Sequence, residues 1–362
     1  MASKAAIRAE AARLQAQFEA AGARPVEAEI LQPAGTLLDL YGEDIRARAY
    51  VTHDPVIGEA MLRPDFTVPV VKMHMAEGSE PARYTYAGEV FRAQEEAAHR
   101  SPESLQVGYE LFERDDPASA DAEVFSLISE VLAPLGLRAA TGDMGLLRAA
   151  VAGLETSERR KGALLRHLWR PRRFRALLER FAGRAPMPKG RAELIAAADP
   201  MACDAPEIGL RSRAEIEARV NALREDAQTP PIPAAQLRLV EDLLALRSNA
   251  ADAGEHLLDL AVDMPAIGPA AERFRRRVDA LTARGIDVET LDFEGSYGRT
   301  ALEYYDGFVF GFYAETRPDL PPVATGGRYD ALTRVLGQGR EIPAVGAVIR
   351  PELVLALTEG GA

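Results

Sequence analysis

Two stretches of sequence decide the fold, Tyr86-Ala-Gly-Glu-Val-Phe-Arg92 and Leu105-Gln-Val-Gly-Tyr-Glu-Leu-Phe112. Both contain the β-branched and aromatic residues that favour strands, and a polar linker joins them. Consecutive strands of this kind pair antiparallel, so we predict a hairpin. Because side chains alternate between the two faces of a strand, Gln106 and Glu110 should share one face, and the hairpin should bring Arg92 close to it.

Glu110 is the most informative residue of this hairpin. It precedes Leu111 and Phe112, and an inward-facing carboxylate is costly to bury unless a cationic or hydrogen-bond-donating ligand meets it. The alternative is an exposed strand position, which needs no ligand.

The residues around the hairpin follow a plan of strands, then helices, then strands. Residues 25–140 alternate short strand-like runs with Pro and Gly breaks, whereas residues 143–285 show apolar residues at helical spacing. Strand character then returns. We therefore predict an α+β fold, with an antiparallel sheet core flanked by helices at residues 1–140 and 290–362 and a helical insertion at residues 141–289.

A second polar pair stands in Met61-Leu-Arg-Pro-Asp-Phe-Thr-Val-Pro69. On an extended chain Asp65 and Thr67 point to the same face. A carboxylate beside a hydroxyl group accepts hydrogen bonds from an ammonium group. The alternative is local turn chemistry after Pro64.

Paired tyrosines and paired glycines mark the C-terminal part. They stand in Leu302-Glu-Tyr-Tyr-Asp-Gly-Phe-Val-Phe310 and Ala324-Thr-Gly-Gly-Arg-Tyr-Asp-Ala-Leu332. On a strand, Tyr304 and Tyr305 would face opposite sides, so that one lines a pocket while the other packs. Two adjacent glycines permit close approach of the backbone to a ligand. Each feature alone is weak, because both residue types are common in strands and turns.

Charge is unevenly distributed along the chain. The formal net charge is −12, and that average field repels a polyanion such as tRNA. Residues 148–184 nevertheless carry eleven Arg and Lys against three Glu. This basic segment suits a solvated helical face, a contact with an acidic partner protein, or a nucleic-acid site in which Trp169 stacks on a base.

Several classes of protein are disfavoured by what the sequence lacks. Its five histidines show no metal-binding spacing and its single cysteine, Cys203, is best read as a small buried apolar residue, so we expect no metal and no cofactor. No run approaches the roughly 20 apolar residues that span a bilayer, and the N-terminus lacks the apolar stretch of a signal peptide. We therefore expect a cytoplasmic protein with no membrane partner.

In combination and in this order, the segments resemble histidyl-tRNA synthetase, a class II aminoacyl-tRNA synthetase. The likeness covers about residues 5–140 and 290–358, and Pro33 resembles the motif 1 proline. The matching segments are Met61–Val68, similar to LRPE-x-T with Asp65 in place of Glu; Gly88–Glu110, similar to motif 2; Leu302–Tyr305, similar to RGLDYY; and Thr325–Leu332 with Pro343–Gly346, similar to the GGRYD-x-L and PAVG segments before motif 3.

The resemblance implies a class II core that forms a dimer and binds histidine. Asp65, Thr67 and Gln106 would hold the α-amino group. Glu110 and Tyr305 would meet the imidazole nitrogens, which offer a donor and an acceptor, or two donors when charged. The site implied by position comprises Asp65, Thr67, Arg92, Gln106, Glu110, Tyr304 and Tyr305.

The departures from the synthetase pattern concern the groups that act on ATP. The arginine of RGLDYY falls at Thr300, and Arg299, one residue off, would face the other way on an extended strand. The motif 3 arginine falls at Glu352, whose carboxylate would repel a triphosphate. The motif 2 linker carries Glu95 and Glu96, and no sequence for an anticodon-binding domain of about a hundred residues follows the last predicted helix.

This pattern resembles the regulatory subunits that accompany short ATP phosphoribosyltransferases in histidine biosynthesis. The resemblance implies a non-catalytic protein that binds L-histidine for feedback control and activates a catalytic ATP phosphoribosyltransferase subunit in a hetero-oligomer, without tRNA. The alternative is a truncated enzyme that activates histidine by adenylation, with ATP held by Arg92 and Arg328.

Overall fold

The predicted hairpin lies inside the larger of two sheets. Strands β5 (Ala82–Phe91) and β6 (Glu103–Phe112) pair antiparallel, with Gly88 opposite Gln106 and Tyr84 opposite Glu110. The prediction of an antiparallel hairpin is therefore confirmed.

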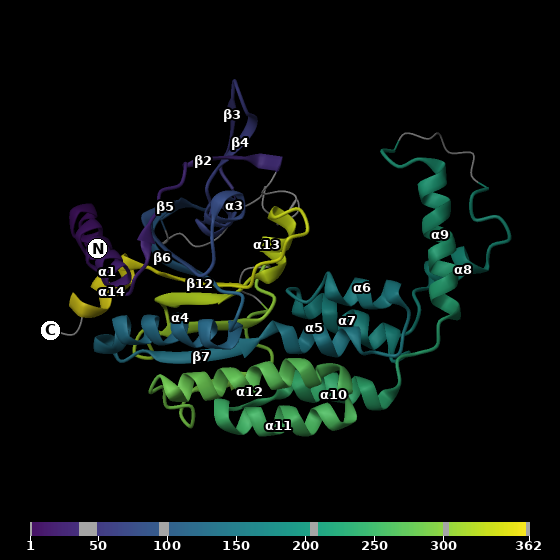
Figure 1. Ribbon diagram of the computed structural model, residues 1–362. Helices are drawn as coiled ribbons and strands as arrows, with labels where there is room; N and C mark the ends of the chain where they lie inside the picture. The colour runs from purple at the N-terminus through teal and green to yellow at the C-terminus, as the bar shows by residue number, and fades with distance from the viewer. Residues whose placement is uncertain (1, 36–48, 94–100, 203–208, 300–303, 360–362) are drawn as a thin grey trace.

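The computed structural model describes residues 2–35, 49–93, 101–202, 209–299 and 304–359 (Figure 1).

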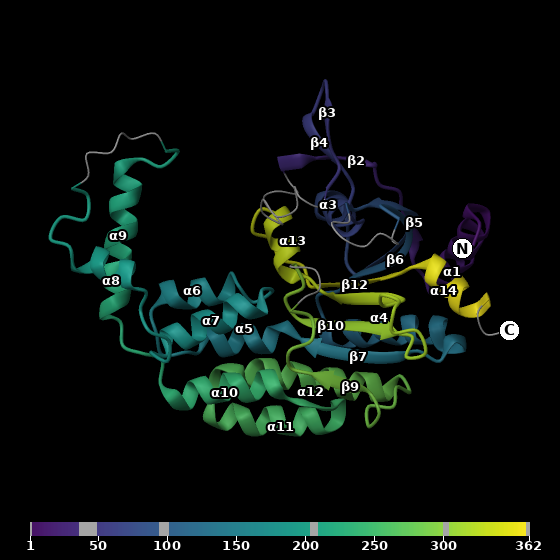
Figure 2. The ribbon, with the colours of Figure 1, turned by 180° about the vertical axis from the view of Figure 1, so that it is seen from behind.

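The larger sheet has the strand order β1-β5-β6-β12-β11-β10-β7-β9-β8 within the described residues. All neighbours from β5 to β7 are antiparallel, whereas β1 and β9 join the sheet as parallel strands. Figure 2 shows β10 between β12 and β7. The remaining strands of this sheet are β1 (Arg24–Pro25), β7 (Arg138–Asp143), β8 (Arg247–Asn249), β9 (Asp292–Glu294), β10 (Phe308–Tyr313), β11 (Ala324–Arg328) and β12 (Ala344–Ile349).

Alternation along β6 separates an apolar face from a polar one. Val107, Tyr109 and Leu111 are buried in one hydrophobic cluster with residues of helices α1 (Lys4–Ala20) and α4 (Pro117–Leu132). Gln106 and Glu110 are on the opposite face because they alternate with these residues. That face is covered by α3 (Thr67–Glu77), whose His74 ring stacks on Phe112 at 3.9 Å between centroids.

Strand β11 forms from a glycine-rich stretch that is not among the predicted strands. Its glycines allow neighbouring strands and rings to approach closely. A Cβ atom on Gly326 would lie 2.3 Å from the Phe310 ring and 2.7 Å from the carbonyl oxygen of Gly346. Packing between strands, which strand propensity does not report, therefore determines this element.

Helices occupy most of the chain between β7 and β9. Helices α10, α11 and α12 lie together beneath the sheet in Figure 1, whereas α9 stands away from the body. Strand β8 of this region pairs with β9 at the edge of the main sheet. The domain division at residues 141–289 stays a prediction. The helices are α5 (Met144–Ala152), α6 (Glu158–Leu165), α7 (Pro171–Phe181), α8 (Lys189–Ala196), α9 (Arg213–Gln228), α10 (Ala234–Ala245), α11 (Ala250–Asp263) and α12 (Gly268–Ala283).

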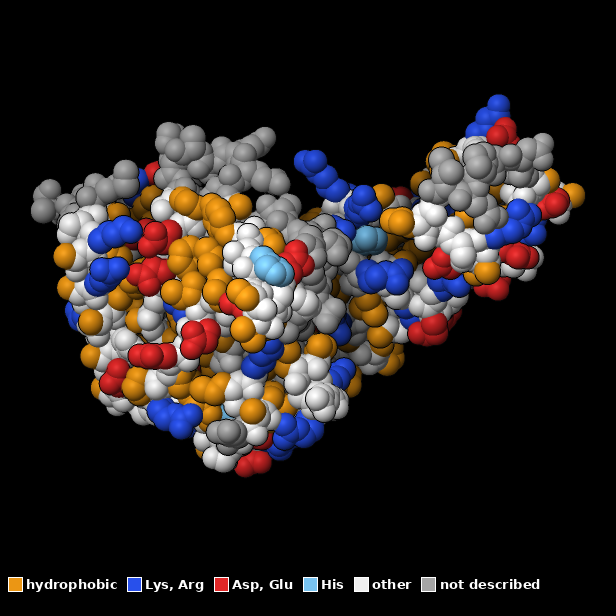
Figure 3. All heavy atoms as spheres, turned by 90° about the horizontal axis from the view of Figure 1, so that it is seen from above, with side chains coloured by type: hydrophobic (Ala, Val, Ile, Leu, Met, Phe, Trp, Pro, Cys, Tyr) orange, Lys and Arg blue, Asp and Glu red, His pale blue; other side chains and the backbone are white. Residues whose placement is uncertain are grey.

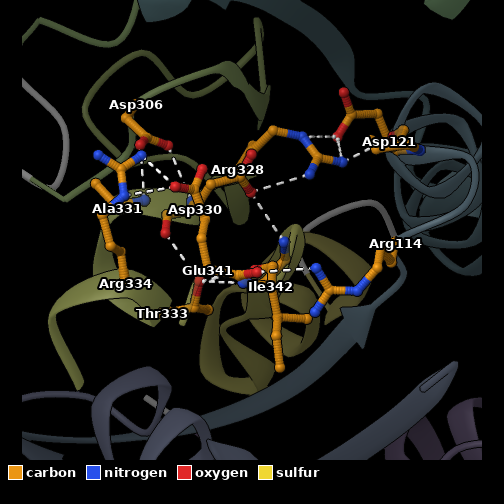
Figure 4. Close-up of polar contacts among 12 residues, drawn as sticks. Arg114, Asp121, Asp306, Arg328, Asp330, Ala331, Thr333, Arg334, Glu341 and Ile342 are labelled. Carbon is orange, nitrogen blue, oxygen red and sulfur yellow. Dashed lines mark hydrogen bonds and ion pairs between the residues drawn. The ribbon is translucent and has the colours of Figure 1, made fainter. Parts of the chain in front are cut away.

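A buried ion network ties the helical region to the sheet. Arg277 of α12 bonds to Asp143 at 2.7 Å and to Asp121 of α4 at 3.3 Å. Arg328 of β11 bonds to the other oxygen of Asp121 at 2.7 Å and to Asp330 at 3.0 Å (Figure 4). Because separating a buried ion pair leaves an uncompensated charge, this network fixes α4, α12 and β11 relative to one another.

Two short helices complete the core. Helix α13 (Asp330–Leu336) begins where the carboxylate of Asp306 accepts hydrogen bonds from the backbone N–H groups of Asp330 and Ala331, at 3.0 and 2.8 Å (Figure 4). An anion is favourable at a helix N-terminus. Helix α14 (Pro351–Glu359) packs beside α1.

A small sheet of β2 (Leu31–Pro33), β4 (Gly58–Leu62) and β3 (Val51–Asp54) stands on top of the body in Figure 1. Several of its apolar side chains are exposed, among them Leu31, Val51 and, between β3 and β4, Val56 and Ile57. Across the described ranges, none of the helices has the length and apolar character needed to cross a membrane.

The buried network predicts a large effect for Asp121→Ala. This change removes the carboxylate shared by Arg277 and Arg328. We expect the free energy of unfolding, measured by urea denaturation, to fall by at least about 3 kcal/mol. The control is Asp279→Ala, which removes an exposed partner of Arg275 on α12 and should cost less than about 1 kcal/mol. Equal losses in the two variants would contradict the role of the network.

Candidate functional site

The candidate site is built around the buried carboxylate of Glu110, which is 1% exposed. Its Oε1 accepts hydrogen bonds from the hydroxyl groups of Thr67 at 3.1 Å and Tyr86 at 3.0 Å. Its Oε2 accepts one from the hydroxyl group of Tyr329 at 2.6 Å. Three neutral donors from α3, β5 and the start of α13 therefore hold a carboxylate that has no Arg or Lys among its hydrogen-bond donors in the described chain.

This environment sets the ionisation of Glu110. Burial raises its pKa to about 7, against the hydrogen bonds from Tyr329, Tyr86 and Thr67, which favour the charged form. The carboxylate of Asp65 raises it further. Near neutral pH both forms of Glu110 are therefore populated, so the same group accepts a hydrogen bond as an anion or donates one as an acid.

Glycines on the neighbouring strands make room for this arrangement. Gly346 of β12 lies opposite Glu110, and a Cβ atom there would lie 1.6 Å from Glu110 Oε2. A Cβ atom on Gly108 would lie 2.0 Å from the Tyr86 ring. Glycine at both positions is therefore a condition for burying the carboxylate and its donors.

Asp65 and Thr67 reach the site from the start of a helix. The expectation of an extended chain here is wrong, because α3 begins at Thr67 and Asp65 Oδ1 accepts from the backbone N–H of Val68 at 3.4 Å. The carboxylate of Asp65 nevertheless raises the pKa values of Glu110 and Tyr305, which requires the three groups to lie close together. The start of the helix brings both side chains to the polar face of β6.

Tyr304 and Tyr305 lie in a turn before β10, so the expectation that they form part of a strand is wrong. Their rings meet edge to face, with centroids 5.0 Å apart. The Tyr304 hydroxyl donates to Thr67 Oγ1 at 3.3 Å. The Tyr305 side chain is buried, and burial together with the charges of Glu110 and Asp65 raises its pKa.

Gln106 and Arg92 complete the set predicted from the sequence. Gln106 is 3% exposed and shares the face of β6 that carries Glu110. Its Oε1 is buried and finds no hydrogen-bond partner in the described part of the chain. Arg92 donates from Nε to the carbonyl oxygen of Pro64 at 2.7 Å, and its charge lowers the pKa of Tyr305. The structure thus gathers all seven predicted residues on one side of the sheet.

Two members of the site were missed in the sequence, Tyr86 and Tyr329. Both stand inside the quoted segments, but neither spacing nor residue type shows that their hydroxyl groups meet Glu110. Strand register explains the contact of Tyr86. Tyr86 pairs with Gly108, and because Gly108 has no side chain, the Tyr86 ring packs over it and its hydroxyl group reaches Glu110. A glycine opposite a tyrosine in paired strands is the signal that would have found this contact.

Two arginines that were considered for ATP binding, Arg328 and Arg299, bond to other parts of the protein. Arg328 donates to Asp121, Asp330 and the carbonyl oxygen of Pro117, and, although burial lowers its pKa, the two carboxylates raise it overall. Arg299 donates to the carbonyl oxygen of Leu168 in the helical region. Arg299 lies in a turn, so the expectation of an extended segment is wrong at this residue, and its side chain is directed toward the helical region.

Glu352, at the expected position of the motif 3 arginine, lines a cavity of about 70 Å³ together with Glu89 and Glu103. The two cations of this cavity are paired: Lys4 lies 3.3 Å from Glu103, and Arg8 lies 3.3 Å from Glu89. An excess carboxylate remains, which is unfavourable for a phosphate group. Thr300, Glu95 and Glu96, together with Cys203, lie outside the described residues.

Gly346→Ala tests the packing of the site. The added methyl group would collide with Glu110 Oε2, so we expect the free energy of unfolding to fall by roughly 2 kcal/mol in urea denaturation. Gly162→Ala is the matched control, because it lies within α6 and its Cβ atom would meet nothing within 4 Å. That variant should be as stable as the parent or more stable by up to about 1 kcal/mol. A neutral Gly346→Ala would contradict the close approach of the carboxylate.

Comparison with known proteins identifies the family of this chain. The family model for histidyl-tRNA synthetase matches residues 2–225 and 213–354. An ATP phosphoribosyltransferase regulatory subunit from Brucella canis is 31% identical over 370 residues, which cover 95% of this chain and 96% of that protein. The protein of the same name from Brucella abortus has the same identity and covers 95% of each chain.

Solved structures show the same fold. A protein described as an ATP phosphoribosyltransferase regulatory subunit/histidyl-tRNA synthetase from Bacillus halodurans superimposes with a TM-score of 0.68 at 21% identity, over 97% of this chain and 79% of the other. A histidine–tRNA ligase subunit from Alicyclobacillus acidocaldarius gives a TM-score of 0.60 at 25% identity, over 98% and 93%. The predicted synthetase-like α+β fold is confirmed.

The fold is therefore that of histidyl-tRNA synthetase, and the chain belongs to the family of ATP phosphoribosyltransferase regulatory subunits.

Proposed function

We propose that this protein binds L-histidine at the Glu110 site and, as a non-catalytic subunit, transmits that occupancy to a catalytic ATP phosphoribosyltransferase subunit. The observation that carries the proposal is a buried carboxylate whose hydrogen-bond donors among the described residues are neutral hydroxyl groups, on the same face of β6 as the buried and unpartnered Oε1 of Gln106. A ligand that combines a polar ring nitrogen with an ammonium group complements these two groups.

The imidazole ring of histidine fits the ionisation of the site. Imidazole titrates near pH 6.5, close to the raised pKa of Glu110 at about 7. A proton shared between the two groups gives either an imidazolium beside a carboxylate or an imidazole beside an acid, and both pairs form a hydrogen bond. Tyr305 offers a donor or an acceptor to the second nitrogen. This match favours histidine over an aliphatic amino acid.

The α-amino group has acceptors of its own. The unpartnered Oε1 of Gln106 is a buried acceptor that an ammonium group would satisfy. Asp65 supplies negative charge nearby, and Thr67 adds an acceptor on the same side. Leaving a buried amide oxygen without a partner costs about 1–3 kcal/mol, which a bound ammonium group would recover.

The arrangement of cations supports a regulatory subunit over the alternative, a histidine-adenylating enzyme. Adenylation requires cationic groups at the phosphates of ATP. Arg328 is engaged by two aspartates, and Glu352 stands in a cavity with excess negative charge. We therefore propose that the protein activates its catalytic partner when histidine is scarce and inhibits it when histidine is bound. Such coupling requires different histidine affinities in two states of the complex, typically by about 1–3 kcal/mol.

Glu110→Gln should weaken histidine binding at least about 100-fold, because it removes the charged partner of the imidazole ring. Isothermal titration calorimetry measures the affinity, and circular dichroism checks the fold. Glu217→Gln, an exposed change on α9, should leave the affinity unchanged.

Unchanged histidine affinity in Glu110→Gln would refute the assignment of the site. The enzyme alternative is tested separately by ATP–pyrophosphate exchange in the presence of histidine. We expect no exchange above the level without protein, and robust exchange would favour the adenylating enzyme.

We further propose that the protein self-associates as a dimer in the cytoplasm, without tRNA or membrane partners. We place the dimer interface at the small sheet, because several of its apolar residues are exposed. Its strand β2 contains Pro33, the residue that resembles the motif 1 proline. Figure 3 looks down on this end of the body and shows hydrophobic side chains gathered there. An exposed apolar patch of this kind is typical of a protein–protein contact.

Charged substitutions should separate the dimer. We expect sedimentation analysis of the parent protein at about 10 μM to give the mass of two chains, and Val51→Lys combined with Ile57→Lys to give the mass of one. Leu210→Lys serves as control, because Leu210 is equally apolar and fully exposed but lies outside the small sheet. A double variant that stays dimeric would exclude this surface.

A further inference from the structure

A second cavity lies in the helical region, away from the Glu110 site. Its volume is about 380 Å³, within the range of small-molecule pockets. It opens between α7, α10 and the turn at Ser296–Arg299, and Figure 1 shows α7 and α10 one above the other. The lining residues are Pro171, Arg172, Phe174, Arg175, Leu178, Glu179, Glu241, Leu244, Ala245, Ser296 and Arg299.

Arg299 gives this cavity its chemistry. The residue is 6% exposed, donates from Nε to the carbonyl oxygen of Leu168 at 2.9 Å, and places its guanidinium 4.6 Å above the Phe174 ring. Its Nη2 is buried without a hydrogen-bond partner among the described residues. Among the described residues, no carboxylate pairs with Arg299. Burial lowers the pKa of its guanidinium group to about 10. A buried cation in this condition is unfavourable until an anion reaches it.

The other charges of the cavity indicate a singly charged ligand. Arg172 and Arg175 of α7 also line it, together with Glu179 of the same helix and Glu241 of α10. Both glutamates already face Arg184, at 3.9 and 2.9 Å. The lining contains three arginines and two glutamates, and so carries one more positive than negative charge. A polyanion would meet the two carboxylates, whereas a monoanion matches the single excess charge.

The rest of the lining is apolar. Phe174 and Leu178 of α7 face Leu244 of α10 across the cavity. Burial of hydrocarbon here would stabilise a ligand by roughly 25 cal/mol per Å² of apolar surface removed from water. An occupant should therefore combine an apolar body with one acidic group that reaches the buried Arg299.

We propose that this cavity binds a small organic monoanion, a carboxylate on an apolar body, through the guanidinium of Arg299. The site is separate from the proposed histidine site, and it uses residues of the helical region together with the segment that leads toward Tyr304. Part of the basic segment at residues 148–184 then has a role other than a solvated face: Arg172 and Arg175 attract the anion at the mouth of the cavity.

Benzoate and benzamide are the probes, because they share one shape and differ in charge. We expect calorimetry on the full chain to show benzoate binding with a dissociation constant of about 1 mM or tighter. Benzamide should bind at least about tenfold more weakly, since it cannot pair with the guanidinium.

Two variants and one control locate the binding. Arg299→Met should lose benzoate binding by at least about tenfold while keeping or raising the melting temperature, since it replaces an unpaired buried charge by an apolar chain. Ala245→Trp fills the exposed rim without removing a contact and should also abolish binding. Arg173→Gln changes an exposed arginine of α7 outside the lining and should leave binding unchanged.

Absence of benzoate binding at about 10 mM, or equal affinity for benzoate and benzamide, would overturn the proposal. Unchanged benzoate binding in Ala245→Trp would overturn it even if Arg299→Met failed to fold. Glu110→Gln should leave benzoate binding intact. The test of the anion cavity is therefore independent of the test of the proposed histidine site, because either site can fail its test without the other.

Discussion

The burial of one carboxylate within the sheet is the constraint on which the site depends. Glu110 lies in β6, and its two oxygens accept hydrogen bonds from three hydroxyl groups without a neutralising cation. Each donor comes from a different element, so the positions of α3, β5 and the start of α13 are linked through one group. The glycine at position 346 is part of the same constraint, because only a residue without a Cβ atom leaves space for the carboxylate. A polar group that is buried and mainly hydrogen-bonded rather than charge-paired holds its neighbours rigidly and remains able to exchange a proton with a ligand.

The arginines illustrate how burial decides what a cation does. Arg328 and Arg299 are both almost fully buried, yet among the described residues Arg328 pairs with two carboxylates and Arg299 with none. The first is committed to joining β11 with α4, and it is unavailable to a phosphate group. The second retains an unsatisfied N–H donor beside a cavity. In this synthetase-like core, Arg328 therefore has a structural role, and the chain belongs to a family of regulatory subunits.

The sequence determined the class of fold, and it named seven residues that the structure brings together. Strand formers in the hairpin, helical periodicity after residue 143 and five ordered segments were enough to predict an α+β synthetase-like core, because these signals are local. Gln106 and Glu110 were placed on one face by alternation alone. The seven residues predicted from the likeness also lie on the same side of the sheet.

Only the tertiary structure decided which groups satisfy one another. The spacing of Asp65 and Thr67 suggested an extended chain, but packing against β6 makes Thr67 the first residue of α3. Tyr86 and Tyr329 became partners of Glu110 through strand register and the absence of side chains at Gly108 and Gly346. The isolation of Arg299 is equally invisible in sequence, since it depends on α7 and α10 closing around it. Hydrogen bonds between residues far apart in the chain require donor–acceptor distances of about 3 Å, met to within a few tenths of an ångström. Local sequence patterns carry no information on such distances.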